Sequence, residues 1–324
     1  MFTLRTAVTG GAGFIGSHLV DYLMSKGHYV KVFDNFSAGK IENIRQWMSH
    51  ERFELYKVDL KDRNAVFEKL KDVDVVFHLA ANPEVRLGSQ DPYAIYSDNV
   101  EVTFNVLEAM RLNGIKYIVF TSSSTVYGET NVRPTPEDYS PMEPISVYGA
   151  SKLACEALIM GYAHTFNIKA LILRLANIVG PRAQHGVIYD FIHKLLADPT
   201  QLEILGDGSQ RKSYLYISDC IEAIYHLFRE FTKSNALIEV YNIGSQDWIT
   251  VKEIADIVVE EMGLKGVKYR FTGGVEGGRG WRGDVKYMLL DVSKALEKGW
   301  RPKHTSRDAV RLAARALIKE VGKC

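Results

Sequence analysis

The stretch that decides the fold is Val8-Thr9-Gly10-Gly11-Ala12-Gly13-Phe14-Ile15-Gly16-Ser17-His18. It follows an apolar segment typical of a buried strand, residues 5–9, and opens a helical pattern over residues 14–26. Gly10, Gly13 and Gly16 have the spacing G-x-x-G-x-x-G, and Gly11 also gives G-x-G-x-x-G with the last two. Such glycines permit a tight turn and let backbone N–H groups approach a pyrophosphate at the helix N-terminus. The stretch therefore predicts a dinucleotide site, although an ordinary strand-to-helix turn can carry the same glycines.

Strand-like and helix-like segments alternate through the first half of the chain. Parallel strands need helical crossovers of this kind, so the alternation predicts an α/β fold with a doubly wound parallel sheet (Rossmann). The expected strands are 5–9, 29–33, 53–58, 73–79, 117–121 and 170–175, and the expected helices are 14–26, 65–70, 99–113 and 148–166.

The alternation weakens after about residue 176, where glycine and proline become denser. Helical patterns return at 250–262 and 306–321. We expect residues 1–176 to form the dinucleotide-binding domain, with 213–245 returning to it. Residues 177–324 are expected to form mainly a smaller α/β C-terminal lobe that binds the substrate.

Composition excludes several classes of function. The 324 residues are 46% hydrophobic and 24% charged with a net charge of +1, which predicts no nucleic-acid or membrane surface. Cys155, Cys220 and Cys324 lack metal-ligand spacing, so we expect reduced thiols and no metal site. The N-terminus does not resemble a signal peptide, and no apolar run could span a bilayer. The expected location is cytoplasmic.

Three further segments fit a dinucleotide. Asp34 ends the second expected strand, where a carboxylate can accept hydrogen bonds from ribose hydroxyls and repel a 2′-phosphate, so NAD is favoured over NADP. Asp59-Leu60 follows the third strand, where it could read the adenine. Leu79, Ala80 and Ala81 are small enough at the end of the fourth strand to leave room for the cofactor. His78 is interpreted as a packed strand-end residue.

A tyrosine and a lysine lie one helical turn apart at Tyr148 and Lys152. A nearby ammonium and the positive nicotinamide ring are expected to lower the tyrosine pKa from about 10, so that the phenol can move a proton. Tyr22 and Lys26 have the same spacing but lie in the helix that starts at the glycine motif, so we interpret them as structural. The hydroxyl cluster of residues 121–125 could bridge a substrate to Tyr148.

With these segments in view, the chain resembles the extended short-chain dehydrogenase/reductase superfamily of NAD-dependent nucleotide-sugar epimerases and dehydratases, most closely the UDP-glucose 4-epimerases. The matching segments are TGGAGFIGSHL (9–19), DNFSAGK (34–40), HLAA (78–81), SSSTVYG (122–128), YGASK (148–152), RLANIVGPR (174–182), GDGSQRKSYLYISD (206–219), YNIG (241–244) and WRGDV (281–285). They run the length of the chain.

The resemblance, with the arguments above, assigns the site residues. The catalytic set is Ser123, Tyr148 and Lys152; Ser123 is counted four residues before Tyr127, and Ser122 and Ser124 are its neighbours in register. The substrate set is Ser123, Tyr148, Asn177, Lys212 and Asp284. The cofactor set is Gly10, Gly13, Phe14, Ile15, Gly16, Asp34, Asn35, Ser37, Gly39, Asp59, Leu60, Leu79, Ala80, Ala81, Asn99, Tyr148 and Lys152.

The implied reaction interconverts UDP-glucose and UDP-galactose through a 4-keto sugar, in the manner of an NAD-dependent UDP-glucose 4-epimerase. Ser124 and Thr125 stand where 4,6-dehydratases carry Asp-Glu, which argues against dehydration. A uronate 4-epimerase or a decarboxylase stays open, because Arg86 could face a sugar carboxylate, and a non-catalytic NAD sensor stays open as a third class. Pro83 and Trp281 depart from the family pattern, with Arg279 and Arg282 beside the latter.

The resemblance also implies a homodimer. Two subunits would pair helices 99–113 and 148–166 into a four-helix bundle, with Val102, Val106, Leu158 and Tyr162 as candidate packing residues. These residues could equally cover the sheet of their own subunit.

Overall fold

The computed structural model describes residues 3–322, so Cys324 lies outside the described part. The backbone divides into two units that alternate along the chain. The first unit comprises the residues up to Val126, then Val147–Arg174 and Ile224–Tyr241. The second comprises Tyr127–Ser146, Leu175–Ala223 and the residues from Asn242 onward. Which ligand each unit binds stays a prediction.

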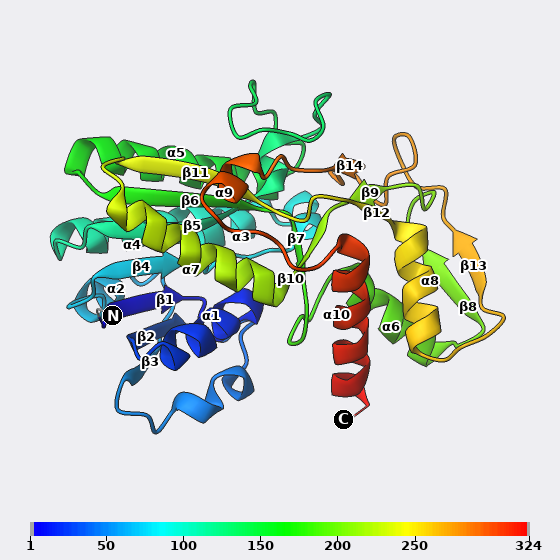
Figure 1. Ribbon diagram of the computed structural model, residues 1–324, viewed down its shortest axis with the longest axis horizontal. Coiled ribbons are helices and arrows are strands. Elements are labelled where there is room, and N and C mark those ends of the chain that lie inside the picture. The colour runs from blue at the N-terminus through cyan, green and yellow to red at the C-terminus, as the bar shows by residue number, and fades with distance from the viewer. Residues whose placement is uncertain (1–2, 323–324) are drawn as a thin grey trace. The chain divides into compact units, whose positions relative to one another are not determined.

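A seven-stranded sheet forms the centre of the first unit (Figure 1). Its order is β11-β6-β5-β4-β1-β2-β3, and the pairs β1–β2, β2–β3, β1–β4 and β4–β5 are parallel. The strands are β1 (Arg5–Thr9), β2 (Tyr29–Asp34), β3 (Phe53–Lys57), β4 (Val75–His78), β5 (Tyr117–Ser123), β6 (Lys169–Leu175) and β11 (Ile238–Ile243). The order reverses between β1 and β4, which is the switch point at which doubly wound sheets bind ligands. The predicted α/β class is confirmed.

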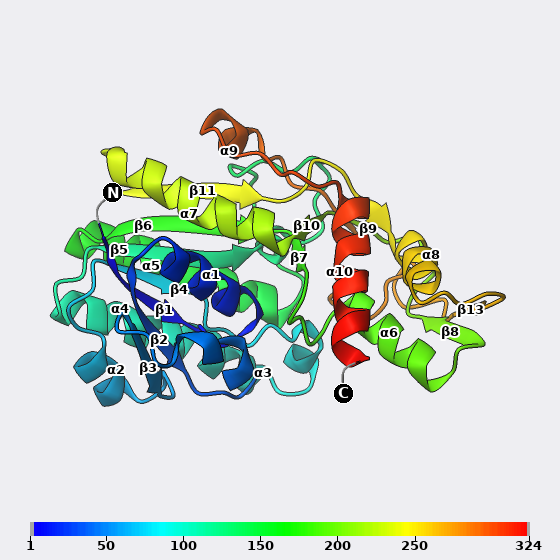
Figure 2. The ribbon, with the colours of Figure 1, turned by 60° about the horizontal axis from the view of Figure 1, so that its bottom comes forward.

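Helices cover both faces of this sheet (Figures 1 and 2). On one face α1 (Phe14–Ser25) lies beside α7 (Ile217–Lys233), where the rings of Tyr22 and Tyr225 meet and Phe228 packs on Phe77 of β4. The other face carries α2 (Arg63–Lys69), α4 (Val102–Leu112) and α5 (Val147–Phe166), which share one apolar core with the alternate residues of the strands. The sheet is therefore buried on both faces, as parallel sheets usually are.

The second unit has a core of three helices, α6 (Val187–Ala197), α8 (Val251–Glu261) and α10 (Ser306–Val321). Thr250 with Glu253 and Thr305 with Asp308 form capping boxes that start α8 and α10. Small sheets accompany these helices: β10 (Tyr214–Tyr216) with β7 (Asn177–Val179), β13 (Lys268–Phe271) with β8 (Gln201–Ile204), and β12 (Ile249–Thr250), β9 (Arg211–Lys212) and β14 (Tyr287–Met288) together.

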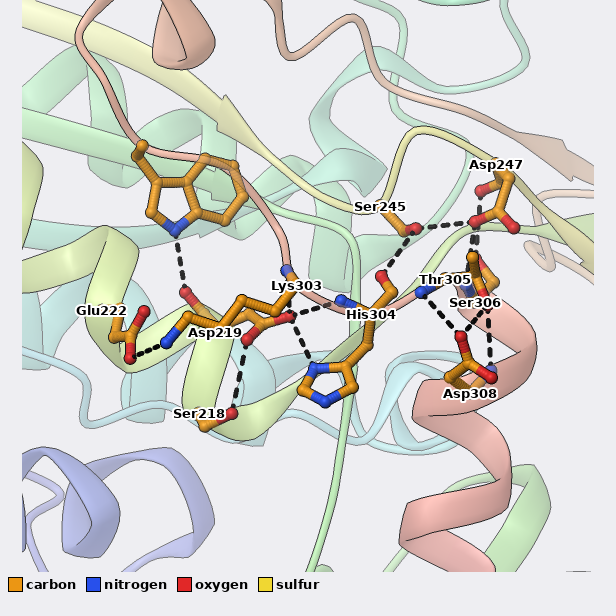
Figure 3. Close-up of polar contacts among 11 residues, drawn as sticks. Ser218, Asp219, Glu222, Ser245, Asp247, Lys303, His304, Thr305, Ser306 and Asp308 are labelled. Carbon is orange, nitrogen blue, oxygen red and sulfur yellow. Dashed lines mark hydrogen bonds and ion pairs between the residues drawn. The ribbon is translucent and has the colours of Figure 1, made fainter.

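A polar network holds the segment that leads into α10 (Figure 3). The carboxylate of Asp219 is fully buried, accepts hydrogen bonds from the backbone amides of Lys303 and His304, and lies 3.0 Å from Nδ1 of His304. Asp247 accepts the backbone N–H of Ser306 at 2.8 Å. These contacts anchor the start of α10 to the start of α7 and to the β11–β12 turn.

Several elements differ from the sequence-based expectation. Helices α6 and α7 were not predicted, and the expected helix 99–113 is divided, because a π-helical segment at Ser97–Glu101 precedes α4. The remaining short helices are Ile41–Asn43, Arg45–Trp47, Val85–Ser89, α3 (Pro92–Tyr96), Ser124–Tyr127 and α9 (Ser293–Glu297). Among residues 3–322, no helix is long and apolar enough to cross a membrane, and no three His, Cys, Asp or Glu side chains group as metal ligands.

Candidate active site

The glycine loop between β1 and α1 is built for close backbone contact. A Cβ on Gly16 would lie 2.0 Å from the carbonyl oxygen of Gly10, and Gly10 itself has φ +68° against the backbone of Ala80. Gly13 is the N-cap of α1, no side chain caps that end, and no acidic residue lies in the first turn. The amides of Phe14, Ile15 and Gly16 therefore start a helix whose positive end accepts an anionic group.

Asp34 lies beside this loop at the end of β2. One carboxylate oxygen accepts the backbone N–H of Ala12 at 2.9 Å, and the other accepts that of Phe36 at 2.8 Å. A Cβ on Gly39 would lie 2.7 Å from the carboxylate, so this glycine leaves Asp34 its space. Burial raises the pKa of Asp34, while the two amide hydrogen bonds oppose that rise. Both oxygens keep a second acceptor position for ribose hydroxyls.

The other predicted adenosine contacts lie around the ends of β2 and β3. Asn35 accepts the backbone N–H of Ser37 and donates to Asp59 at 3.4 Å. Asp59 accepts the backbone N–H of Lys61, while Leu60 is buried. The structure thus brings these residues together at one edge of the sheet, and their contact with a cofactor stays a prediction.

His78 connects β1 to α4 inside the first unit. Its Nδ1 lies 2.7 Å from Oγ1 of Thr9, and its Nε2 lies 3.0 Å from Oγ1 of Thr103. Thr9 Oγ1 also accepts hydrogen bonds from the backbone amides of Leu79 and Ala80, so the Thr9 hydroxyl donates its proton to Nδ1 of His78. The ring proton of His78 is therefore on Nε2. Complete burial lowers the pKa of His78 to about 3, so the ring is neutral. This geometry agrees with a structural role.

Asn99 is 1% exposed and lies in the π-helical segment before α4. Its side-chain oxygen accepts the backbone N–H of Asn82 at 2.7 Å, and its amide donates to Oγ of Ser151 at 2.9 Å. Ser151 in turn donates to the backbone carbonyl of Tyr148. In the structure Asn99 therefore positions the loop after β4 and the first turn of α5, and its direct contact with NAD stays a prediction.

Of the three serines at the end of β5, Ser123 is the one bonded to Tyr148. Its oxygen also accepts a hydrogen bond from the Thr125 hydroxyl at 2.9 Å. In the chain without NAD, burial raises the pKa of Tyr148 to about 12, and only the hydrogen bond from Ser123 lowers it. The expected fall, which includes the charge of the nicotinamide ring, stays a prediction. Desolvation outweighs the single hydrogen bond because a phenolate needs more compensation than a neutral phenol.

Lys152 lies one turn below Tyr148 and is 3% exposed. Its Nζ donates to the carbonyl oxygen of Thr121 at 3.0 Å and lies 4.8 Å from the centre of the Phe120 ring. Burial lowers the pKa of Lys152 to about 8, while electrostatic interactions with the neighbouring Cys155 and Glu156 oppose that fall. The ammonium is thus held at the end of β5 beside Ser123.

Sequence reasoning missed a buried ion pair next to this site. Glu156 on α5 and Arg174 on β6 are 2.7 Å apart, with side chains 1% and 3% exposed, and Ser122 donates to Glu156. The available signal was the charged Glu156 four residues after Lys152, on the face of α5 that also carries the apolar Ile159 and Ala163. No sequence pattern pointed to Arg174 as its partner.

In the second unit the predicted substrate residues Asn177, Lys212 and Asp284 lie together. Lys212 forms an ion pair with the buried carboxylate of Asp284 at 2.5 Å, and its Nζ lies 5.8 Å from the centre of the Trp281 ring. Asn177 donates from its side chain to the backbone carbonyl of Ser213, the residue after Lys212. Sequence reasoning did not point to Gln210, which is 2% exposed and whose buried Oε1 has no hydrogen-bond partner among the described residues.

Comparisons with known proteins identify the family of the chain. A model of the NAD dependent epimerase/dehydratase family matches residues 6–244. A putative UDP-glucose 4-epimerase of Methanocaldococcus jannaschii is 36% identical over 311 residues, which are 94% of this chain and 95% of the relative. A crystal structure of a UDP-galactose 4-epimerase is 47% identical with a TM-score of 0.88, covering 98% of this chain and 100% of that one.

A third comparison is with a UDP-glucuronic acid 4-epimerase from Bacillus cereus, solved with UDP-glucuronic acid and NAD. It is 30% identical with a TM-score of 0.86, covering 98% of this chain and 100% of that one. The family model spans well over half of the chain, and the two solved structures match the fold over 98% of it. The chain therefore belongs to the NAD dependent epimerase/dehydratase family.

Proposed function

We propose that this protein is a UDP-glucose 4-epimerase that interconverts UDP-glucose and UDP-galactose with a retained NAD. The observation that carries the proposal is the group formed by Ser123, Tyr148 and Lys152 in the same unit as the glycine loop. A phenol, a hydroxyl bonded to it and a buried ammonium suit proton exchange with a sugar alcohol. The relatives named above that act on UDP-glucose or UDP-galactose support the choice of substrate.

The residues present fit NAD. The uncapped start of α1 and the absence of side chains at Gly10 and Gly16 leave backbone for a pyrophosphate, and Asp34 offers oxygens to a ribose while disfavouring a 2′-phosphate. NAD, when bound, would supply a hydride acceptor that returns the hydride to carbon 4 of the sugar. The predicted roles of Tyr148 and Lys152 on the nicotinamide ribose and the predicted cofactor contact of Asn99 complete the binding set.

The protein's own residues would move the proton. Tyr148, as phenolate, would take the proton of the sugar 4-hydroxyl while Ser123 donates to the developing charge. Lys152, as ammonium, would stabilise the phenolate. Loss of that proton from oxygen and of a hydride from carbon 4 gives a 4-keto sugar, which turns about its diphosphate link. The hydride would then return to the other face of carbon 4, and Tyr148 would return the proton to the oxygen. Because both the proton and the hydride would return to the sugar within one turnover, no second substrate is required.

We assign the nucleotide to the second unit. Lys212 carries a positive charge for the diphosphate, Asp284 offers a carboxylate to the ribose, and Asn177 an amide. Arg279 and Arg282, beside Trp281, already pair with Glu129 and Glu276 at 3.2 and 3.5 Å. Lys212 is itself paired with Asp284 at 2.5 Å, so pairing does not distinguish the three cations. Lys212 is preferred because the family resemblance implies a cation near the diphosphate at its position.

A uronate 4-epimerase is the second candidate, favoured by the similarity to the enzyme from Bacillus cereus. It would need a cation for the sugar carboxylate, and Arg86 is the residue that the sequence offers. Nε of Arg86 forms an ion pair with Glu84 at 3.2 Å, and Glu84 also accepts the backbone N–H of Arg86. This local pairing favours the neutral hexose.

We also propose the predicted homodimer, with a correction to its packing residues. Val102 and Val106 are 5% and 0% exposed in the core of the first unit, so they cannot pack against a second subunit. Phe104 and Phe166 are 37% and 40% exposed, and each of their rings contacts Tyr162. This aromatic strip on α4 and α5 (Phe104, Tyr162 and Phe166) is the surface we assign to the partner subunit.

Purified protein incubated without added NAD tests the proposed function. Separate reactions contain UDP-galactose, UDP-N-acetylgalactosamine and UDP-glucuronic acid, and the products are separated by chromatography. Conversion of UDP-galactose to UDP-glucose supports the proposal. Conversion of UDP-glucuronic acid alone would replace it with the second candidate, and no conversion by NAD-loaded protein would favour a sensor.

A further inference from the structure

A buried acidic residue lies one helical turn beyond Lys152. Glu156 is 1% exposed, and moving a lone carboxylate into such a place is strongly unfavourable unless partners compensate it. Arg174 supplies two donors, with Nε 3.0 Å and Nη2 2.7 Å from the carboxylate oxygens. Ser122 supplies a third through its hydroxyl. Glu156 is therefore a fully bonded anion inside the first unit.

Ser122, the hydroxyl partner of Glu156, lies on β5 between the two residues that contact Lys152 and Tyr148. The preceding residue, Thr121, accepts the hydrogen bond from Lys152, and the following residue, Ser123, bonds to Tyr148. A side chain that fixes Ser122 thus fixes the stretch of strand that holds both groups. Arg174 extends this support to the neighbouring strand β6.

The charges around Lys152 also depend on Glu156. The titratable groups that interact with the ammonium are Cys155 and Glu156 on α5 and the neutral His78 on β4. The contacts from β5 are uncharged: the Thr121 carbonyl and the Phe120 ring. Burial raises the pKa of the Cys155 thiol, so that thiol is neutral at physiological pH. Glu156 is therefore the carboxylate that offsets the desolvation of the ammonium.

We propose that Glu156 is a positioning residue for the proton transfer, which keeps Lys152 charged and fixes the end of β5 through Ser122. This inference rests on the proposed function for the identity of the substrate. The contacts of Glu156 on which it is argued do not depend on that function. The predicted catalytic set of Ser123, Tyr148 and Lys152 does not include Glu156, Arg174 or Ser122.

The test compares pH profiles of turnover for the wild type and Glu156→Gln. A neutral amide removes the negative charge that stabilises the Lys152 ammonium. The alkaline limb of the turnover profile should therefore move to lower pH by about one unit. With the wild-type pKa of Lys152 at about 8, turnover should then fall about fivefold more at pH 9 than at pH 7, with the KM for the UDP-sugar unchanged. The matched control is Glu108→Gln, which breaks an ion pair with Arg111 on α4 and should leave the limb in place. An equal loss at every pH would mean a structural role and overturn the proposal.

Arg174 left without its partner could prevent Glu156→Gln from folding, so the double variant Glu156→Gln/Arg174→Met is measured in parallel. Replacing both members of a buried pair is usually tolerated, and it still removes the carboxylate next to Lys152. Its alkaline limb should also lie below that of the wild type. A wild-type limb in this variant would contradict the proposal.

Melting temperature gives a readout that needs no substrate. Burial places the folded pKa of Lys152 below its unfolded value, so the ammonium destabilises the fold until pH rises through the folded pKa. Without Glu156 that folded pKa falls further, so the double variant should be less stable than the wild type at pH 6.5 and approach it by pH 9. A deficit that does not change with pH would contradict the proposal. If UDP-galactose is not converted at all, the proposed function fails while this measurement still decides the role of Glu156.

Discussion

At the scale of single residues, Tyr148 is a phenol whose ionisation the folded chain opposes. Burial raises its pKa to about 12, and Lys152 directs its Nζ to the Thr121 carbonyl. The positive charge of an oxidised nicotinamide ring would lower that pKa where Ser123 already donates a hydrogen bond. We therefore expect Tyr148 to ionise readily only in the NAD-loaded enzyme.

Substituting Tyr148→Phe tests its role against a matched control. We expect a loss of turnover of about 10²–10⁴-fold, because the group that moves the proton is removed, with bound NAD retained. Tyr22→Phe, at the other Y-x-x-x-K spacing on α1, should keep its turnover. The assay is formation of UDP-glucose from UDP-galactose, with NAD content read by absorbance after denaturation. Full activity of the Tyr148 variant would refute the mechanism.

His78 predicts a pH dependence of stability. Its folded pKa is about 3 against an ordinary value of 6.5, so below pH 6.5 the unfolded chain binds a proton that the folded chain refuses. Stability should therefore fall as pH decreases, and His78 should contribute about 1.4 kcal/mol per pH unit. His78→Asn should flatten the urea-unfolding free energy between pH 6 and pH 4.5, whereas the exposed His50→Asn should not. Identical slopes in both variants would show that His78 titrates normally.

At the scale of elements, the glycine loop depends on one close approach. A Cβ at Gly16 would lie 2.0 Å from the Gly10 carbonyl oxygen, whereas one at Gly161 of α5 would meet nothing within 4 Å. Gly16→Ala should abolish NAD binding and lower stability, while Gly161→Ala should stabilise the protein by up to about 1 kcal/mol through helix propensity. Calorimetric titration with NAD and denaturant unfolding measure the two effects. NAD binding by Gly16→Ala at wild-type affinity would contradict the proposed cradle.

The elements that the local sequence predicts are those in which apolar residues recur with a strong helical or strand period. The strands around the glycine loop and helices α1, α5, α8 and α10 lie within a few residues of expectation. Helix α7 was not predicted although one of its faces is apolar, because denser glycine and proline weaken the alternation of strands and helices after about residue 176. The π-helical turn at Ser97–Glu101 has no sequence period, since it depends on the tertiary contacts of Asn99.

At the scale of the whole molecule, the aromatic strip on α4 and α5 predicts a dimer. Sedimentation of the wild type should give twice the mass of the chain, and Phe104→Lys should shift the equilibrium toward the monomer, because it places a charge in an apolar contact. Leu196→Lys, at an exposed apolar position on α6, is the control and should leave the mass unchanged. A monomeric wild type at micromolar concentration would remove the homodimer from the account.

The candidate site residues that stand in short motifs could be predicted from the sequence. The buried residue pairs that hold the surrounding segments in place could not. Ser123, Tyr148 and Lys152 stand in recognisable segments, and the structure brings them together. The pairings of Glu156 with Arg174 and of Asp219 with His304 join residues 18 and 85 positions apart, which no local pattern encodes. The raised pKa of Tyr148 was also beyond the sequence, because desolvation is set by packing.

The most direct test of the account follows an isotope at carbon 4 of the sugar. UDP-galactose with deuterium at that carbon is converted by the purified enzyme in ordinary water without added NAD, and the UDP-glucose is examined by mass spectrometry and NMR. The account predicts that the deuterium stays at carbon 4, because the hydride that leaves is the hydride that returns. Loss of the deuterium to solvent, or a requirement for added reductant, would contradict it.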